Sequence, residues 1–145
     1  MEWKEKIRRW CATGERSELE TREKLKRLGA SSNEIEVELK FLENEGFISE
    51  SRYVSAFVHD HFRLKNWGPI KLFHALRKKG CSAHLIESEL SKISENEIEE
   101  ALQTVINARL TLYPEEHKIQ RERLIRYLQN RGYTFDNILS ALRRL

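Results

Sequence analysis

Histidine and cysteine are the residue types in this chain best suited to metal binding or nucleophilic chemistry, and their spacing argues against both. No histidine forms a His-Glu-x-x-His pattern or pairs with a cysteine at a metal-binding interval. His59 and His61 are two residues apart, so a helix would direct their side chains about 200° away from each other. We therefore expect no metal site and no cofactor. The histidines are His59, His61, His74, His84 and His117.

The two cysteines, Cys11 and Cys81, fit neither a disulfide framework nor a zinc spacing. We expect both to be small buried side chains in a reducing cytoplasm.

No apolar run approaches the roughly 18 residues that a membrane-spanning helix needs, and residues 1–6 lack the apolar segment of a signal peptide. The sequence thus predicts a cytoplasmic protein with no membrane partner.

Motifs for catalysis are also missing from the sequence. It contains no glycine-rich phosphate loop, no Gly-x-Ser-x-Gly turn and no recognisable Cys/His dyad. Pairs of glutamates, such as Glu115 and Glu116, fall in acidic stretches that we interpret as solvated helix faces. The sequence predicts that the protein is not an enzyme.

Lysine and arginine form two clusters, which are the best candidates for binding chemistry. The chain has a net charge of +3, but residues 1–48 carry −1, residues 49–93 carry +4 and residues 94–145 carry zero. Such segregation favours an acidic or polyanionic partner. We predict that the clusters contact this partner together with Trp67, which precedes Gly68 and Pro69 at a helix boundary, and that the acidic first segment is less involved. The predicted partner-binding residues are Arg52, Arg63, Lys65, Trp67, Lys71, Arg77, Lys78, Lys79, Lys118, Arg121, Arg123, Arg126 and Arg131.

An internal repeat indicates which elements position these residues. Gly29, Gly80 and Gly132 are 51 and 52 residues apart, and each has a leucine four residues before it. Aliphatic residues follow each glycine at intervals of 6, 10 and 13 residues, which is the spacing of one helix face. A glycine in the left-handed conformation typically ends a helix. Each copy is thus predicted to contain a helix, a glycine turn and a second helix.

A further amphipathic helix is predicted before each pair, and capping signals mark several of the helix starts. Ser17, Ser31 and Ser94 each precede a glutamate by three residues, the pattern of a capping box, and Ser82 and Thr134 are further predicted N-caps. Pro69 and Pro114 suit the first turn of a helix. The helices that precede the pairs are expected over residues 3–13, over residues 50–65 and after the capping box at Ser94.

The sequence therefore predicts an all-α protein of three tandem three-helix repeats, in which nine helices form an elongated rod. The repeats are expected at residues 1–48, 49–93 and 94–145. The sequence leaves the curvature of the rod open.

Three segments resemble the RecX family of regulatory proteins. Residues 11–19 (CATGERSEL), followed by Lys24 and Leu25, are similar to its N-terminal signature. Residues 51–58 (SRYVSAFV) resemble its central motif, although Ser51 stands where the family commonly has aspartate. Residues 67–71 (WGPIK) and 76–80 (LRKKG) resemble a Gly-Pro segment that ends in Lys-Gly, with Asn66 in place of a frequent first glycine.

The resemblance implies a bacterial protein that lodges in the groove of the RecA filament on single-stranded DNA. There it would slow filament extension, homologous recombination and the co-protease activity of RecA in the SOS response, and so act in DNA repair. We expect a monomer that also makes weak direct contact with DNA. The alternatives are a helical repeat protein that binds DNA without RecA and a helical scaffold for another protein.

Overall fold

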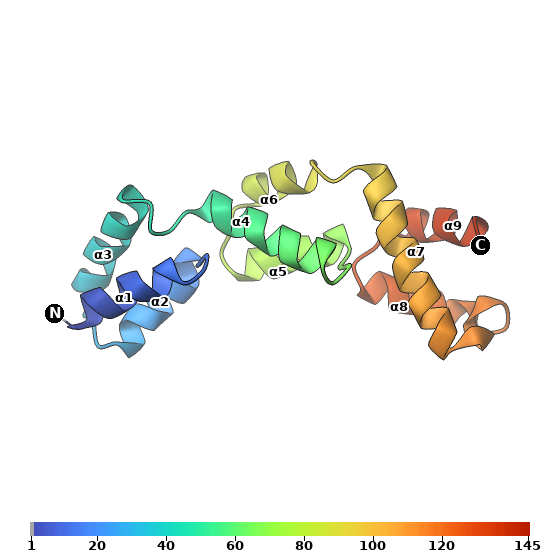
Figure 1. Ribbon diagram of the computed structural model, residues 1–145, viewed down its shortest axis with the longest axis horizontal. Helices are drawn as coiled ribbons and strands as arrows, with labels where there is room; N and C mark the ends of the chain where they lie inside the picture. Colours follow the sequence, from blue (N-terminus) through green and yellow to red (C-terminus); the bar gives the residue numbers. More distant parts are fainter. Residues whose placement is uncertain (1) are drawn as a thin grey trace.

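The computed structural model describes residues 2–145, and within them every regular element is a helix. Figure 1 shows the helices in three groups along one long axis, with the first and third groups hanging below the middle one. The all-α prediction and the prediction of an elongated tandem array are confirmed, and the array is curved. The helices are α1 (Glu2–Ala12), α2 (Glu18–Arg27), α3 (Ser32–Asn44), α4 (Glu50–Val58), α5 (Pro69–Lys78), α6 (Ala83–Leu90), α7 (Glu95–Leu112), α8 (Arg121–Asn130) and α9 (Phe135–Arg143).

Serine and threonine hydroxyls begin most of these helices. At α2 the Ser17 hydroxyl accepts a hydrogen bond from the Glu20 amide at 3.1 Å, and the Glu20 carboxylate accepts one from the Ser17 amide at 2.7 Å. The same reciprocal pair begins α3 at Ser31 and α7 at Ser94. The predicted capping boxes are confirmed, and a cap of this kind stabilises a helix by about 1 kcal/mol.

The repeated glycines end α2, α5 and α8 as the repeat predicts. Gly29, Gly80 and Gly132 have φ values of +96°, +85° and +101°. The residue after each glycine donates its amide hydrogen to a leucine carbonyl at 3.1 to 3.3 Å. In each copy this leucine lies four residues before the glycine. This is the Schellman arrangement, in which the residue after the glycine packs back onto the helix. That residue is buried in each copy, as Ala30, Cys81 or Tyr133.

Two segments differ from the predicted helices. The helix expected over residues 50–65 is regular only to Val58 and continues as the π-helical segment η1 (His59–Arg63). Pro69 begins α5 as predicted, but Pro114 begins the short 3-10 segment η2 (Pro114–His117) rather than α8. The amides of Ile119 and Gln120 both donate to the Glu115 carbonyl, which turns the chain before α8 starts at Arg121.

The buried side chains form two separate cores. One core lies within the first three helices and contains Ile7, Leu25 and Leu42, none of which has exposed surface. The other extends from Tyr53 in α4 to Leu142 in α9, and it joins the second and third groups of helices. The predicted boundaries between the repeats, after residues 48 and 93, stay predictions.

Two glycines join the second and third groups by direct backbone contact. The Gly68 amide donates to the Arg131 carbonyl at 2.7 Å, and the Ile70 amide donates to the Gly132 carbonyl at 3.0 Å. A Cβ atom on Gly68 would lie 2.3 Å from the Gly132 carbonyl carbon, so only glycine fits at this position. The Tyr133 hydroxyl also donates to the Asn66 carbonyl, at 2.8 Å.

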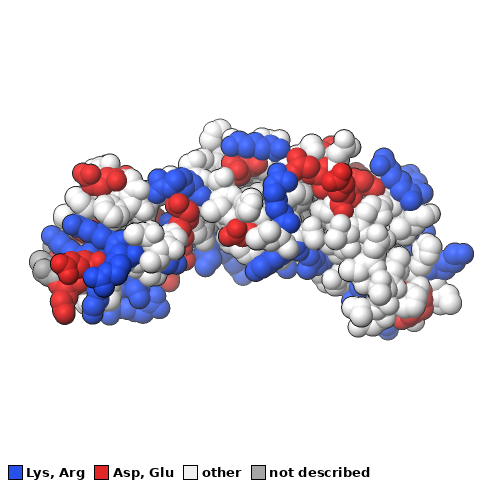
Figure 2. Space-filling model, viewed as in Figure 1, with Lys and Arg blue, Asp and Glu red and all other residues white. Residues whose placement is uncertain are grey.

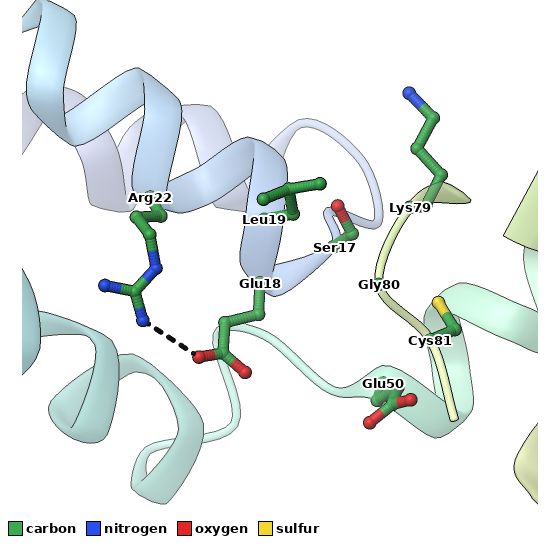
Figure 3. Close-up of a pocket in the computed structure, with 8 residues that line it drawn as sticks. All are labelled: Ser17, Glu18, Leu19, Arg22, Glu50, Lys79, Gly80 and Cys81. Atoms are coloured by element: carbon green, nitrogen blue, oxygen red, sulfur yellow. Dashed lines mark hydrogen bonds and ion pairs between the residues drawn. The ribbon is translucent and has the colours of Figure 1, made fainter. Parts of the chain in front are cut away.

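The contact between the first and second groups is polar and open. Arg52 of α4 forms an ion pair with Glu15 at 3.1 Å and donates to the Gly46 carbonyl at 2.7 Å. Beside this contact lies a cavity of about 240 Å³ between α2 and the turn that follows α5. Leu19 on one side and Lys79 and Gly80 on the other line it, as Figure 3 shows.

Candidate partner interface

Three of the predicted partner-binding residues are held in contacts between helix groups. Arg52 pairs with Glu15 across the first junction, and Arg63 of η1 pairs with Glu97 at the start of α7. Arg131 donates to the carbonyls of Lys65 and Asn66, and it thereby joins the third group of helices to the second. The Arg63 guanidinium donates a hydrogen bond to the Glu97 carboxylate and thereby lowers the pKa of Glu97. These three arginines position the helix groups relative to one another.

Trp67 and Lys71 lie beside the contact between the two glycines. The Lys71 ammonium group is 4.1 Å from the centre of the Trp67 ring, close enough for a cation–π interaction. The indole also packs against Phe57 and His61, with 4.5 Å between the His61 and Trp67 ring centres. Trp67 is half-buried as a result, and its ring is fixed in orientation while part of it stays accessible.

The end of α5 presents a run of three cations. Arg77 donates from Nη1 to the Cys81 carbonyl at 2.9 Å, so one of its N–H groups is already bonded to the turn that follows α5. Lys78 and Lys79 are exposed, and Lys79 borders the cavity that faces α2. Their position at the C-terminal end of the helix is favourable because the carbonyl ends there carry partial negative charge.

The third group of helices brings four of the predicted cations together at the start of α8. They line a groove of about 430 Å³, which also includes Glu122. Ile119 lies among them with 85% of its surface exposed. No ion pair within residues 2–145 engages these four cations, which are Lys118, Arg121, Arg123 and Arg126.

Figure 2 shows that charge is unevenly distributed over the face in view. Acidic side chains gather over the start of α7, where the sequence has Glu95, Glu97, Glu99 and Glu100. Lysine and arginine atoms gather along the lower edge, beneath the first and second groups of helices. The structure therefore separates the two signs of charge in space as well as along the chain.

Two glutamates are buried, which the sequence analysis does not predict for either of them. The Glu116 carboxylate is only 1% exposed and receives two hydrogen bonds from Arg109, at 2.8 and 2.9 Å. The prediction that Glu116 belongs to a solvated face is wrong, because the 3-10 turn directs it inward toward α7. Glu38 is 2% exposed and is bound by Arg8 in the same two-pronged way. Its place between Ile35 and Leu42 on the apolar face of α3 is the sequence signal that could have revealed it.

The two cysteines are buried, as expected, and neither forms a disulfide. Burial raises the pKa of each thiol to about 11, which keeps both protonated at neutral pH. Among residues 2–145, no group of three or more acidic, histidine or cysteine side chains is arranged to hold a metal ion. No helix in the same range has the length and apolar character to cross a membrane.

The fold and this surface define an all-helical tandem-repeat protein with a segregated charge pattern, a class suited to binding extended partners. Comparison with known proteins identifies the family. The model for RecX, second three-helix domain, matches residues 49–90. The chain is 32% identical over 127 residues to the regulatory protein RecX of Pseudomonas syringae pv. tomato, covering 88% of this chain and 81% of that protein. The chain belongs to the RecX family of regulatory proteins.

Other relatives support the same assignment. The regulatory protein RecX of Clostridium botulinum is 33% identical over 132 residues, which are 88% of this chain. The chain spans 61% of the length of that clostridial relative. The crystal structure of RecX from Lactobacillus salivarius superimposes with a TM-score of 0.87 over 99% of this chain and 94% of that one, at 18% identity. A second RecX crystal structure gives a TM-score of 0.83 at 19% identity, over 93% of this chain and 69% of that one. These two likenesses show the fold.

Proposed function

We propose that this protein binds the RecA filament on single-stranded DNA and inhibits or modulates the recombinase and co-protease activities of RecA, without catalysis of its own. The observation that carries the proposal is membership of the RecX family of regulatory proteins. In this proposal the protein acts as a monomer in the bacterial cytoplasm and needs no cofactor.

The shape and charge of the molecule support an extended partner. Three helix groups in a curved array offer a long surface, which suits a filament better than a compact ligand. Lys78, Lys79 and the four cations at the start of α8 lack carboxylate partners within residues 2–145. They are available to an acidic protein surface or to phosphates.

A titration into the DNA-dependent ATPase reaction of RecA tests the proposal. We expect the folded protein to lower the rate of ATP hydrolysis by RecA on single-stranded DNA in a saturable way. An ATPase rate that stays unchanged at micromolar excess of the protein would overturn the proposal.

Charge reversal tests which cations make the contact. Lys78→Glu with Lys79→Glu is expected to weaken inhibition of RecA roughly tenfold or more, because two attractive contacts become repulsive. The matched control is Lys26→Glu with Lys40→Glu, which changes two exposed cations of the first helix group by the same charge. Equal inhibition by both variants would show that the cluster at the end of α5 is only solvated surface.

Direct DNA binding without RecA is the second candidate function. The unpaired cations that line the groove at the start of α8 favour it, because phosphates bind such side chains. It predicts a gel shift of DNA by this protein alone, with a steep dependence on salt concentration. A shift that is absent at low salt would exclude it.

A further inference from the structure

The first helix group contains a groove that the charge of its sequence does not predict. The groove lies where α1 and α2 meet and has a volume of about 290 Å³. Lys6, Arg9, Trp10 and Thr13 line one side, and Lys24 and Leu28 line the other. Three of these six residues are cations and none is acidic.

The net negative charge of this helix group lies mainly on α3. Helix α3 has four glutamates and one lysine, whereas α1 and α2 together have eight cations and five acids. The charge of −3 on α3 therefore cancels the charge of +3 on the other two helices, and the loops bring residues 1–48 to −1. Figure 2 shows lysine and arginine atoms along the lower edge of this group, where α1 and α2 lie in Figure 1.

The cations of the groove differ from their neighbours on the same helices. Arg8 of α1 pairs with Glu38, and Arg22 of α2 pairs with Glu36 and Glu18. In contrast, no carboxylate within residues 2–145 pairs with the cations of the groove, which are Lys6, Arg9 and Lys24. Their charge is available to a ligand.

Trp10 gives the groove an aromatic wall. Its ring is half-buried and packs against the first core. The Arg16 guanidinium lies 4.3 Å from the ring centre, and its Nε donates to the Trp10 carbonyl at 3.3 Å. The core and Arg16 together hold the ring in place before any ligand arrives, so binding would not need to order it. Leu28 adds an apolar contact beside the ring.

We propose that this groove binds single-stranded nucleic acid, with a base against Trp10 and Leu28 and the flanking phosphates on the three cations. Bases pack on aromatic side chains whatever their sequence, and lysine and arginine bind the adjoining phosphates. An acidic peptide would satisfy the cations but carries no base to pack against Trp10 beside Arg16. The inference extends the proposed function to the first helix group, because the RecA filament holds single-stranded DNA.

Nuclear magnetic resonance on the full chain without RecA tests the proposal. The probe is a short oligothymidylate at low salt, and the readout is the indole N–H signal of Trp10, assigned by its loss in Trp10→Phe. We expect this signal to shift saturably, while the indole signal of the buried Trp3 stays in place. Reversal of Lys6, Arg9 and Lys24 to glutamate is expected to lower the affinity roughly tenfold or more, since three phosphate contacts are lost.

A matched triple variant controls for net charge. Lys26→Glu, Arg27→Glu and Lys40→Glu change three exposed cations of the same helix group outside the groove, and we expect them to weaken binding by about threefold or less. A Trp10 signal that does not move at saturation overturns the proposal, as does equal weakening by the two triple variants. Poly-glutamate that shifts Trp10 as strongly as the oligonucleotide would assign the groove to an acidic protein instead. Because RecA is absent, none of these results bears on RecA inhibition.

Discussion

Arg109 holds the Glu116 carboxylate by two parallel hydrogen bonds, and the guanidinium itself lies 4.2 Å from the ring centres of Tyr113 and Tyr127. The carboxylate is almost fully buried, whereas the Arg109 side chain keeps 23% of its surface. A charge buried to this depth is stable only while its partner is present. The pair therefore fixes η2 against α7.

Replacement of Glu116 tests this role. Glu116→Gln keeps the shape of the side chain but removes the charge that both guanidinium hydrogen bonds use. We expect the free energy of unfolding to fall by about 1–3 kcal/mol, measured by urea denaturation. Glu115→Gln is the control, because Glu115 is exposed and its loss is expected to change stability by less than about 0.5 kcal/mol. Equal effects of the two changes would contradict a structural role for the buried pair.

Buried thiols and phenols predict how stability depends on alkaline pH. Burial raises the pKa of Cys11 and Cys81 from 9.0 to about 11, and that of Tyr53 and Tyr133 from 10.0 to about 12. Each group holds its proton more tightly in the folded state, so its contribution to stability is complete below the unfolded pKa. We expect the free energy of unfolding to fall as the pH rises from about 9 to about 12. Denaturation curves at constant salt would show it, and a free energy that stays level over this range would contradict it.

Individual contacts of the predicted interface are the least predictable feature at this scale. The sequence identifies which residues are cations, but it does not show which carboxylate or carbonyl lies opposite each of them. The sequence therefore does not distinguish Arg52, Arg63 and Arg131 from the exposed Lys78 and Lys79. The structure places the three arginines in contacts between helix groups. Apart from Gly46, which is six residues from Arg52, their partners are 34 to 66 residues away along the chain.

At the scale of the elements, local signals predict the helices well. Serine caps, glycine turns and the Pro69 start depend on residues within one turn of each helix end, and these appear directly in the sequence. The contact between Gly68 and Gly132 could not be predicted, because it joins two turns that are distant in the chain. The sequence around Pro114 does not reveal the 3-10 turn, because the inward position of Glu116 depends on its contact with Arg109 in α7.

Substitution of Gly68 tests the contact between the second and third helix groups. Gly68→Ala would place a Cβ atom 2.3 Å from the Gly132 carbonyl carbon, so the two backbones must separate. We expect a loss of roughly 1–3 kcal/mol in the free energy of unfolding, and faster hydrogen exchange at the Ile70 amide. Unchanged exchange at Ile70 would contradict the contact.

Gly29→Ala provides the comparison within the same repeat pattern. Gly29 has a positive φ but no atom within 4 Å of a Cβ at its position. We expect a cost of about 1–2 kcal/mol from the left-handed backbone alone. The Ile70 amide should then exchange as in the unmodified protein.

At the scale of the whole molecule, the two cores divide the chain unequally. The first three helices have a core of their own, whereas one continuous core joins α4 through α9. The first junction relies on Arg52 and its polar partners, beside an open cavity. We expect the first helix group to open independently of the rest of the chain.

Substitutions in the two cores test this independence. Ile7 and Leu76 are both fully buried, one in each core. Each is expected to cost roughly 2–5 kcal/mol when changed to alanine. Ile7→Ala should accelerate hydrogen exchange in residues 2–48 alone, and Leu76→Ala should accelerate it throughout α4 to α9. Acceleration of the whole chain by both variants would show that the molecule unfolds as one unit.

Binding to a RecA filament is the central claim at this scale, and co-sedimentation tests it most directly. Filaments assembled on single-stranded DNA are pelleted with the protein at physiological salt, alongside the same DNA without RecA. We predict that the protein pellets saturably with the filaments and remains largely in the supernatant with DNA alone. Protein that stays in the supernatant with filaments, or that binds DNA equally with and without RecA, would contradict the claim.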